Sequence, residues 1–205
     1  MRLLLKMINK VVLRIMSLII SGLNRLRLFI LPNFFKILKG KITCKGVYPN
    51  CQQLTHITGL GHVEIGYKCM FGYKLGGFHK SGRIEIQPRY KDAIIKIGNN
   101  VATNNNIFIC AANYIEIGDD TLIGQYVTIT DYEAHGIHPL ERRKLGKIGS
   151  VIIGKNVWIG NNVMILKNSS IGDNSIVAAG AVVADKFPSN CIIGGVPAKF
   201  LKELQ

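Results

Sequence analysis

The sequence predicts an all-β solenoid, a stack of short parallel strands preceded by an amphipathic N-terminal helix and closed by a short C-terminal helix. Two observations predict this fold. An aliphatic residue recurs every six positions through most of the chain, and the first 63 residues contain ten Lys or Arg but no Asp or Glu. The 205 residues are 48% hydrophobic and 19% charged, with a formal net charge of +14, which excludes a disordered chain and allows a substantial core.

Residues 1–40 have the pattern of a helix that lies on a surface. At about 100° per residue, the basic and small polar side chains share one arc and aliphatic side chains fill the rest, although Leu3, Leu13 and Ile20 break the pattern. Pro32 ends the predicted helix. Basic residues interrupt the apolar stretch and no small-residue cleavage site follows it, so neither a secretory signal nor a transmembrane helix is predicted.

Two partners fit residues 2–31 of this helix. A cationic polar face beside a wide apolar face is typical of a helix in a membrane interface, and an anionic membrane surface is the favoured partner. The alternative is that the helix packs on its own domain or on a neighbouring subunit, with its lysines solvated. Nucleic acid is not expected, because aromatic residues do not interleave with the basic ones. We expect a cytoplasmic protein, peripheral on the inner face of the cytoplasmic membrane if the first interpretation holds.

The body of the chain, residues 41–196, is predicted to form the solenoid, and the six-residue period is visible from about residue 57. Its clearest series has one aliphatic residue per repeat: Ile153, Ile159, Ile165, Ile171, Val177 and Val183. A helix has a period near 3.6 and a strand a period of about 2, so a period of six indicates short strands joined by regular corners. Gly, Asn and Asp follow these positions, as in Gly154-Lys155-Asn156, and allow the chain to bend. Residues 197–205 are predicted to form the closing helix.

The five cysteines are scattered and form no C-x-x-C pair: Cys44, Cys51, Cys69, Cys110 and Cys191. No His lies near them at zinc-ligand spacing, so we predict reduced, mostly buried thiols and no metal. His56, His62 and His79 are interpreted as structural.

A polar loop at about residues 130–147 interrupts the repeat, which stops at Ile129 and resumes at Ile153. Loops that break a regular scaffold are where binding and catalysis are sought. This loop contains His135 and His138, and an imidazole can take a proton from an attacking hydroxyl or amine near neutral pH. The alternative for either His is an ordinary surface side chain.

The repeat resembles the hexapeptide repeat of the left-handed β-helix acyltransferases from about residue 57 to the end of the chain. The resemblance implies three hexapeptides per triangular coil and a homotrimer with active sites between neighbouring chains. The interrupting loop is similar to the D-x-x-x-H-x-(I/L)-x-P loop of bacterial polysaccharide O-acetyltransferases, which identifies His135 as the catalytic base. A branch similar to maltose and galactoside acetyltransferases places the base in a His-Pro pair, which selects His138 instead. If His135 is the base, His138 is expected to bind the substrate. Asp131 or Glu133 is expected to orient the imidazole, with an exposed loop charge as the alternative.

The C-terminal repeats resemble the acetyl-CoA segment of the same family. The resemblance implies that the Asn161 backbone N–H stabilises the oxyanion and that Lys199 and Lys202 meet the CoA phosphates. The remaining cofactor-side candidates are aromatic or backbone contacts: Trp158, Gly160 and Ala179. The alternative for Lys199 and Lys202 is that they are solvated surface lysines. The alternative for Trp158 is that it packs within the solenoid. The sequence Ala184-Asp185-Lys186 departs from the usual Thr-Lys-Asp and alters the expected contacts to adenine.

One further residue is implied on the acceptor side. Asn104 matches an Asn that contacts the acceptor hydroxyl in sugar acetyltransferases, although an Asn ladder along the solenoid corners would also explain it. Together these residues predict an acetyl-CoA-dependent O-acetyltransferase that acts on a sugar of a capsule, O-antigen or exopolysaccharide. We expect a general-base mechanism without an acyl-enzyme or a metal. The alternatives are an N-acetyltransferase acting on a nucleotide-linked amino sugar and a non-catalytic trimeric scaffold.

Overall fold

The computed structural model describes residues 2–204 and begins with one long helix. Helix α1 (Arg2–Arg25) continues into a π-helical turn (Leu26–Ile30), and after Pro32 a short helix α2 (Phe34–Leu38) leads into the first strand. The helical rod therefore ends just before Pro32, as predicted. None of the described helices has a stretch long and apolar enough to cross a bilayer.

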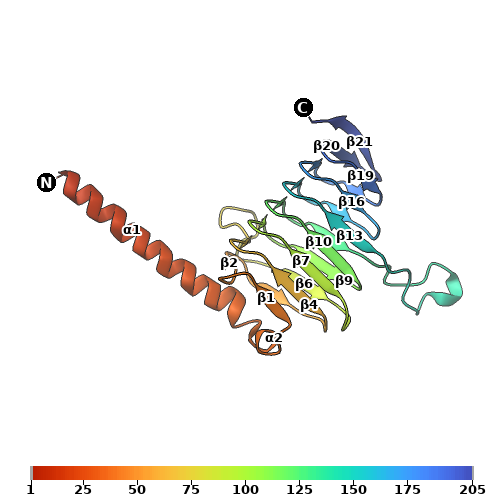
Figure 1. The fold of residues 1–205 in the computed structure, drawn as a ribbon, viewed down its shortest axis with the longest axis horizontal. Coiled ribbons are helices and arrows are strands. Elements are labelled where there is room, and N and C mark those ends of the chain that lie inside the picture. Colours follow the sequence, from red (N-terminus) through yellow and green to blue (C-terminus); the bar gives the residue numbers. More distant parts are fainter. Residues whose placement is uncertain (1, 205) are drawn as a thin grey trace.

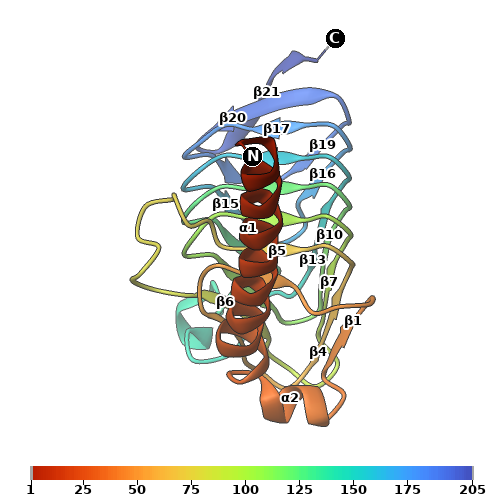
Figure 2. The same cartoon turned by 90° about the vertical axis from the view of Figure 1, so that its left-hand side faces the viewer.

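Helix α1 projects away from the rest of the protein (Figures 1 and 2). Its large apolar side chains from Val11 to Leu23 are exposed, with Leu13 at 66% and Leu18 at 68% exposure. At its C-terminal end the Arg25 Nε donates to the Tyr48 carbonyl at 2.8 Å. Over residues 10–23 the helix does not pack along its own domain, so packing on its own domain is wrong for the described side chains, while packing on a neighbouring subunit stays an alternative.

The remaining chain winds through three parallel sheets, passing from sheet A to sheet B to sheet C in each coil. Sheet A contains β1 (Ile42–Cys44), β4 (His62–Ile65), β7 (Ile94–Ile97), β10 (Tyr114–Ile117), β13 (Ser150–Ile153), β16 (Ser170–Ile171) and β19 (Lys186–Phe187). Sheet B contains β2 (Asn50–Cys51), β5 (Met70–Phe71), β8 (Ala102–Thr103), β11 (Leu122–Ile123), β14 (Trp158–Ile159), β17 (Ile176–Val177), β20 (Cys191–Gly195) and β21 (Ala198–Glu203). Sheet C contains β3 (Thr55–Ile57), β6 (Ile84–Pro88), β9 (Phe108–Ala111), β12 (Thr128–Thr130), β15 (Met164–Ile165) and β18 (Val182–Val183).

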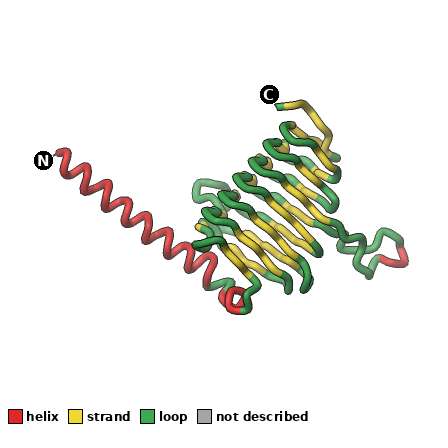
Figure 3. Tube along the Cα trace, viewed as in Figure 1, coloured by secondary structure: helices red, strands yellow, loops and turns green. Residues whose placement is uncertain are grey.

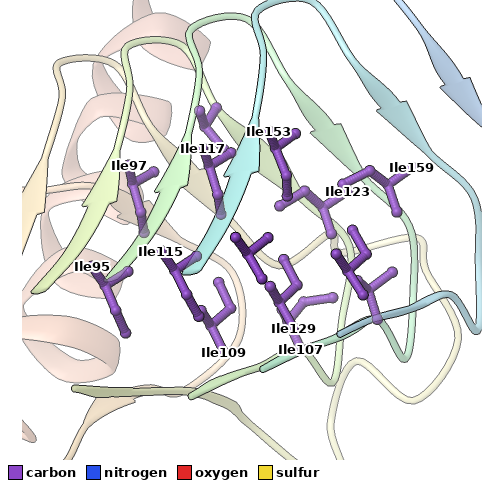
Figure 4. Close-up of a cluster of buried hydrophobic side chains, with 14 of the residues drawn as sticks. Ile95, Ile97, Ile107, Ile109, Ile115, Ile117, Ile123, Ile129, Ile153 and Ile159 are labelled. Carbon is purple, nitrogen blue, oxygen red and sulfur yellow. The ribbon is translucent and has the colours of Figure 1, made fainter. Parts of the chain in front are cut away.

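The repeated aliphatic residues fill the interior of this β-helix, which confirms the predicted fold class. All six members of the clearest predicted series are buried. Equivalent residues stack in register between coils, as Ile97, Ile117 and Ile153 do in sheet A (Figure 4). Each buried Ile contributes roughly 1.5–3 kcal/mol by leaving water, so the stack is the main source of stability.

The corners between sheets are made by residues in the left-handed region of the backbone. Asn156, Asn162, Asn168 and Asn174 have φ between 52° and 64°. Asn tolerates this conformation better than other non-Gly residues, and its side chain can bond along the stack. Asn156 Nδ2 donates to Asn174 Oδ1 at 3.0 Å, and Asn174 Nδ2 donates to Asn190 Oδ1 at 3.0 Å. The corners are visible as loops between the strands in Figure 3.

The predicted C-terminal helix is wrong. Residues 198–203 form β21, which pairs antiparallel with β20 through Gly195↔Ala198 and Cys191↔Glu203. The turn at Gly195, whose φ is +99°, reverses the chain at the end of the solenoid. Strand β20 would otherwise present unpaired N–H and C=O groups, so pairing with its edge favours a strand over a short helix.

Candidate active site

An open groove of about 470 Å³ on the outer face of sheet B ends at the corner where the chain passes into sheet C. We name this the B–C corner; in four successive coils it comprises residues 104–107, 124–127, 160–163 and 178–181. The groove lining is mostly apolar. Three of the residues singled out in the sequence line it together: Asn104, Trp158 and Asn161.

Trp158 faces the groove and not the core. Its residue is 56% exposed, and in register it lies between Leu122 and Ile176 on the outer side of sheet B. Packing inside the solenoid therefore does not explain this residue. An exposed indole beside apolar neighbours is a surface on which the apolar face of a ligand can stack.

Asn104 lies at the groove, whereas its neighbour Asn105 makes structural hydrogen bonds to another coil. The Asn104 side-chain oxygen accepts the Asn105 backbone N–H at 2.8 Å, and its residue is half-buried at the groove. Asn105 is fully buried, and its Nδ2 donates to the carbonyls of Tyr73 and Gly77, each at 3.0 Å. The structural bonds across coils therefore come from Asn105, which leaves the amide nitrogen of Asn104 available to a ligand.

Asn161 is an exposed residue at the B–C corner. Its side-chain Oδ1 accepts the Gln125 N–H at 2.8 Å, and its carbonyl accepts the Gly180 N–H at 2.9 Å. These bonds fix the peptide, while its own N–H has no acceptor among the described residues. A fixed, unsatisfied N–H is the donor that a developing oxyanion requires.

Gly160 and Ala179 continue this corner into the next coil. A Cβ on Gly160 would lie 2.6 Å from the Ala179 nitrogen, so only Gly allows the two coils to stack this closely. Ala179 is exposed. Adjacent coils are about 4.8 Å apart, so an extended chain lying along the corner would meet one backbone segment per coil.

Lys199 and Lys202 both lie on β21 and both are exposed. Lys199 pairs with Gly194 at the end of β20 that leads toward the B–C corner, whereas Lys202 pairs with Ile192 farther along the strand. The two lysines are thus strand residues and not helix residues. Of the two lysines, only Lys199 lies at the end of β21 that is nearest the B–C corner.

The polar loop predicted from the sequence forms a projecting arm, residues 131–149 (Figures 1 and 3). It leaves sheet C after β12 and returns to sheet A at β13, so it belongs to a different corner, the C–A corner. Backbone bonds close the arm on itself: Glu133 N donates to Lys147 O at 2.9 Å, and Gly136 N donates to Lys144 O at 2.9 Å. A short 3-10 turn, Pro139–Glu141, forms its tip.

His135 is exposed on this arm and is oriented by a backbone carbonyl. Its Nδ1 lies 2.7 Å from the Arg142 carbonyl oxygen, which can only accept, so Nδ1 carries the proton. The neutral imidazole therefore presents an unprotonated Nε2, the form that a general base needs. His138 differs, because its Nδ1 accepts the Leu140 N–H at 3.4 Å. Among the described residues, no three His, Cys, Asp or Glu side chains are close enough together to hold a metal ion.

Asp131 does not orient the imidazole, which corrects its predicted role. The residue is fully buried, and its carboxylate accepts the backbone N–H groups of Ala112, Asn113 and Tyr114 at 2.6, 2.8 and 2.7 Å. Burial raises the pKa of the Asp131 carboxyl above its usual range, and the three donors partly counter this effect. Asp131 thus ties the start of the arm to the preceding coil.

Glu133 also has other partners than His135. Its carboxylate lies 3.0 Å from the Lys167 Nζ and accepts the Lys147 N–H at 3.0 Å. The hydrogen bonds from Lys167 and Lys147 lower the pKa of the Glu133 carboxyl. Glu133 therefore fixes the arm to the solenoid, and the Arg142 carbonyl that orients His135 could not be recognised from side-chain types.

A second loop, residues 72–83, was missed in the sequence because its Gly and Lys residues resemble an ordinary turn. It follows β5 at the B–C corner, and Tyr73 lines the groove. Amide side chains hold it: besides Asn105, Gln53 Nε2 donates to the Phe78 carbonyl at 3.2 Å and Gln125 Nε2 donates to the Gly77 carbonyl at 3.0 Å. The end of the groove lined by Tyr73 and Asn104 therefore has a wall of fixed shape.

Comparisons with known proteins agree with this description. The family profile described as bacterial transferase hexapeptide (six repeats) matches residues 150–185. The Escherichia coli K12 protein WbbJ, described as a lipopolysaccharide biosynthesis O-acetyl transferase, is 29% identical over 84% of this chain and 89% of its own length. Galactoside O-acetyltransferase from the same organism is 39% identical over 54% of each chain.

Solved structures give the same result for the fold. A galactoside acetyltransferase in complex with coenzyme A has a TM-score of 0.51 and 36% identity, covering 54% of this chain and 56% of its own. A hexapeptide-repeat acetyltransferase from Vibrio cholerae with acetyl-CoA has a TM-score of 0.51 and 33% identity, over 54% of this chain and 61% of its own. The chain thus spans just over half the length of several of these relatives. The repeat, the three-sheet coil and these likenesses show that the chain is a left-handed β-helix built from hexapeptide repeats and that it is similar to hexapeptide-repeat acetyltransferases.

Proposed function

We propose that this protein transfers an acetyl group from acetyl-CoA to a sugar hydroxyl in the biosynthesis of a surface polysaccharide. The observation that carries the proposal is the groove at the B–C corner. Exposed Trp158 on β14 and the Asn161 N–H, which has no acceptor among the described residues, lie in one coil, and exposed Ala179 lies in the next. The relatives WbbJ and galactoside O-acetyltransferase are described as O-acetyltransferases, and two neighbours are complexes with coenzyme A or acetyl-CoA.

His135 supplies the base in this mechanism. Its Nε2 takes the proton of the acceptor hydroxyl while the hydroxyl oxygen attacks the thioester carbon. The Asn161 N–H donates to the oxyanion of the tetrahedral intermediate. When the intermediate collapses, the carbon–sulfur bond breaks and the imidazolium returns its proton to the thiolate, which leaves as CoA thiol. Lys199 pairs with phosphate charge on the cofactor.

The enzyme acts as a homotrimer in this proposal. His135 lies on an arm at the C–A corner, whereas the groove and Asn161 lie at the B–C corner, so sheet C separates them within one chain. The arm also points outward from its own solenoid (Figure 1). In a three-fold ring, the arm of one chain reaches the B–C corner of the next, which completes one site per interface.

Direct transfer without an acyl-enzyme also fits the thiols. Four of the five cysteines are buried and the fifth, Cys44, is half-buried. Burial raises the pKa of Cys69 to about 11 and that of Cys51 to about 12, so these thiols are protonated at neutral pH. A protonated, buried thiol is a poor nucleophile.

Membrane association through α1 completes the proposal. The helix carries basic residues and no acid, and its described aliphatic side chains are exposed on a rod that stands clear of the coils. Such a helix binds an anionic leaflet from one side. The acceptor is accordingly proposed to be a lipid-linked or membrane-assembled sugar.

Thiol release from acetyl-CoA, measured against a panel of neutral sugars, acidic sugars and amino sugars, tests the proposal. We expect release that depends on a hydroxyl acceptor and product carrying an O-acetyl ester. Release only with amino sugars would replace it by N-acetylation. Absence of turnover with every acceptor, together with absence of CoA binding in calorimetry, would indicate a scaffold and contradict the proposal.

A further inference from the structure

The segment after α1 is attached rigidly to the first coil of the solenoid. Phe29 is fully buried and its ring lies 5.7 Å from that of Tyr48. Asn33 is also buried: its Nδ2 donates to the Phe29 carbonyl at 2.7 Å and to the Thr55 carbonyl at 2.9 Å, while its Oδ1 accepts the Ile57 N–H at 2.7 Å. These contacts fix the orientation of α2 relative to the β-helix.

The residues around this anchor form a surface that we call the foot, residues 31–41. It exposes four large apolar side chains: Leu31 at 60%, Phe34 at 46%, Phe35 at 74% and Leu38 at 68%. Three lysines lie among them: Lys36, Lys39 and Lys41. Burial and the neighbouring charges of Lys39 and Lys41 lower the pKa of Lys36, so the cations of the foot are crowded. Exposed aromatic and aliphatic residues next to uncompensated cations are typical of a membrane contact.

The charge distribution selects an anionic lipid surface over another copy of this segment. Residues 1–63 contain ten basic residues and no Asp or Glu. A second copy would bring the same sign of charge against the foot and α1, and would repel it. An anionic leaflet offers the opposite charge, and each Lys or Arg near such a surface contributes on the order of 1 kcal/mol.

The positions of the two elements are compatible with one flat surface. In Figure 1, α2 lies at the end of the solenoid opposite to the C-terminus, and α1 leaves from that end and runs out to the side, across the direction in which the coils stack. Figure 2 shows α1 in front of the coils in the perpendicular view, with α2 at its lower end. A surface laid along α1 and beneath α2 leaves all the coils on its other side.

We infer that the foot is a second membrane contact, which docks with α1 on an anionic leaflet and makes the β-helix stand upright with its first coil against the lipid. This inference extends the membrane association proposed above. It places the loop 72–83 and Asn104 on the coils nearer the bilayer, and β20 and β21 with Lys199 at the end facing away from it. An acceptor held in the membrane and a cofactor arriving from solution would then enter the groove from opposite ends.

Single-tryptophan fluorescence tests this orientation in the full-length protein. Trp158 is the only Trp, so a Trp158→Phe background carries either Phe35→Trp in the foot or the matched Phe200→Trp, an aromatic 52% exposed at the far end of the solenoid. The probe is a vesicle of phosphatidylglycerol and acyl-brominated phosphatidylcholine. We expect quenching and a blue shift for Phe35→Trp and neither for Phe200→Trp. Vesicle binding without quenching of the foot probe would overturn the foot while leaving association through α1 intact, and a lack of vesicle binding would overturn both.

A charge variant provides a second, independent measurement. Phe35→Asp should weaken sedimentation with the same vesicles by about tenfold, because it removes a large apolar side chain from the interface and adds a negative charge. Phe200→Asp is the control and should sediment normally. Circular dichroism verifies that both variants fold. Equal binding by folded Phe35→Asp and the parent protein would contradict the inference.

Discussion

The B–C corner and the C–A arm are built in opposite ways. At the B–C corner the regular repeat places Asn161 and Ala179 in adjacent coils, and the groups on offer are mostly backbone atoms held by neighbouring coils. The arm breaks the repeat over residues 131–149 and offers a side chain, His135, which a single backbone carbonyl orients. The regular region thus offers fixed backbone donors, while the irregular region offers an imidazole side chain.

This difference supports the proposal that two neighbouring chains share one site. A corner that repeats along the solenoid can extend a ligand groove over several coils but presents the same kind of atoms at each step. In the proposed mechanism the base is on the arm, which interrupts the repeat at the C–A corner. The proposed trimer pairs the arm of one chain with the B–C corner of the next, and the variants below separate their contributions.

The largest effect is expected from His135→Ala. Removing the base should lower turnover by about 10²–10⁴-fold, with little change in acetyl-CoA affinity, because the B–C corner is untouched. Steady-state kinetics and calorimetry measure the two quantities. His138→Ala is the matched control on the same arm and should retain near-parental turnover; the reverse pattern would move the base to His138.

Asp131→Ala should act on stability. Its carboxylate accepts three backbone N–H groups in a buried position, so the variant should lower the free energy of unfolding by about 3 kcal/mol. Denaturant unfolding measures this change. The protein that remains folded at low temperature should keep most of its turnover. A large loss of turnover with unchanged stability would return Asp131 to the chemistry.

The smallest effect is expected at Glu133, and it depends on pH. The pKa of this carboxyl is lowered in the folded protein by its bonds to Lys167 and Lys147, so the anchoring is fully present above the ordinary Glu pKa and is lost as the pH falls through the lowered value. The protection factors of residues 133–147, which are the ratios of the intrinsic amide exchange rate at each pH to the observed rate, should fall over that acidic range. In Glu133→Gln, protection should already be low at neutral pH and should not fall further with acid, and an unchanged acid dependence of protection would show that another group anchors the arm.

The sequence predicted the repetitive part of the molecule well and the irregular part poorly. Each aliphatic residue of the series from Ile153 to Val183 repeats a single physical requirement, so its burial follows from spacing alone. The roles of Asp131 and of the Arg142 carbonyl depend on which coil lies next to the arm, which local sequence does not encode. The terminal strand β21 was missed for the same reason, because the edge that it covers belongs to β20.

Subunit complementation tests the central claim that the two corners of neighbouring chains form one site. His135→Ala and the double variant Asn104→Ala/Trp158→Ala, each of low activity alone, are unfolded and refolded together so that mixed trimers assemble. In a site shared between chains, roughly a quarter of the interfaces combine an intact arm with an intact corner, so the mixture should regain about that fraction of parental turnover. A mixture with no more activity than its two components would contradict the account and place the whole site within one chain.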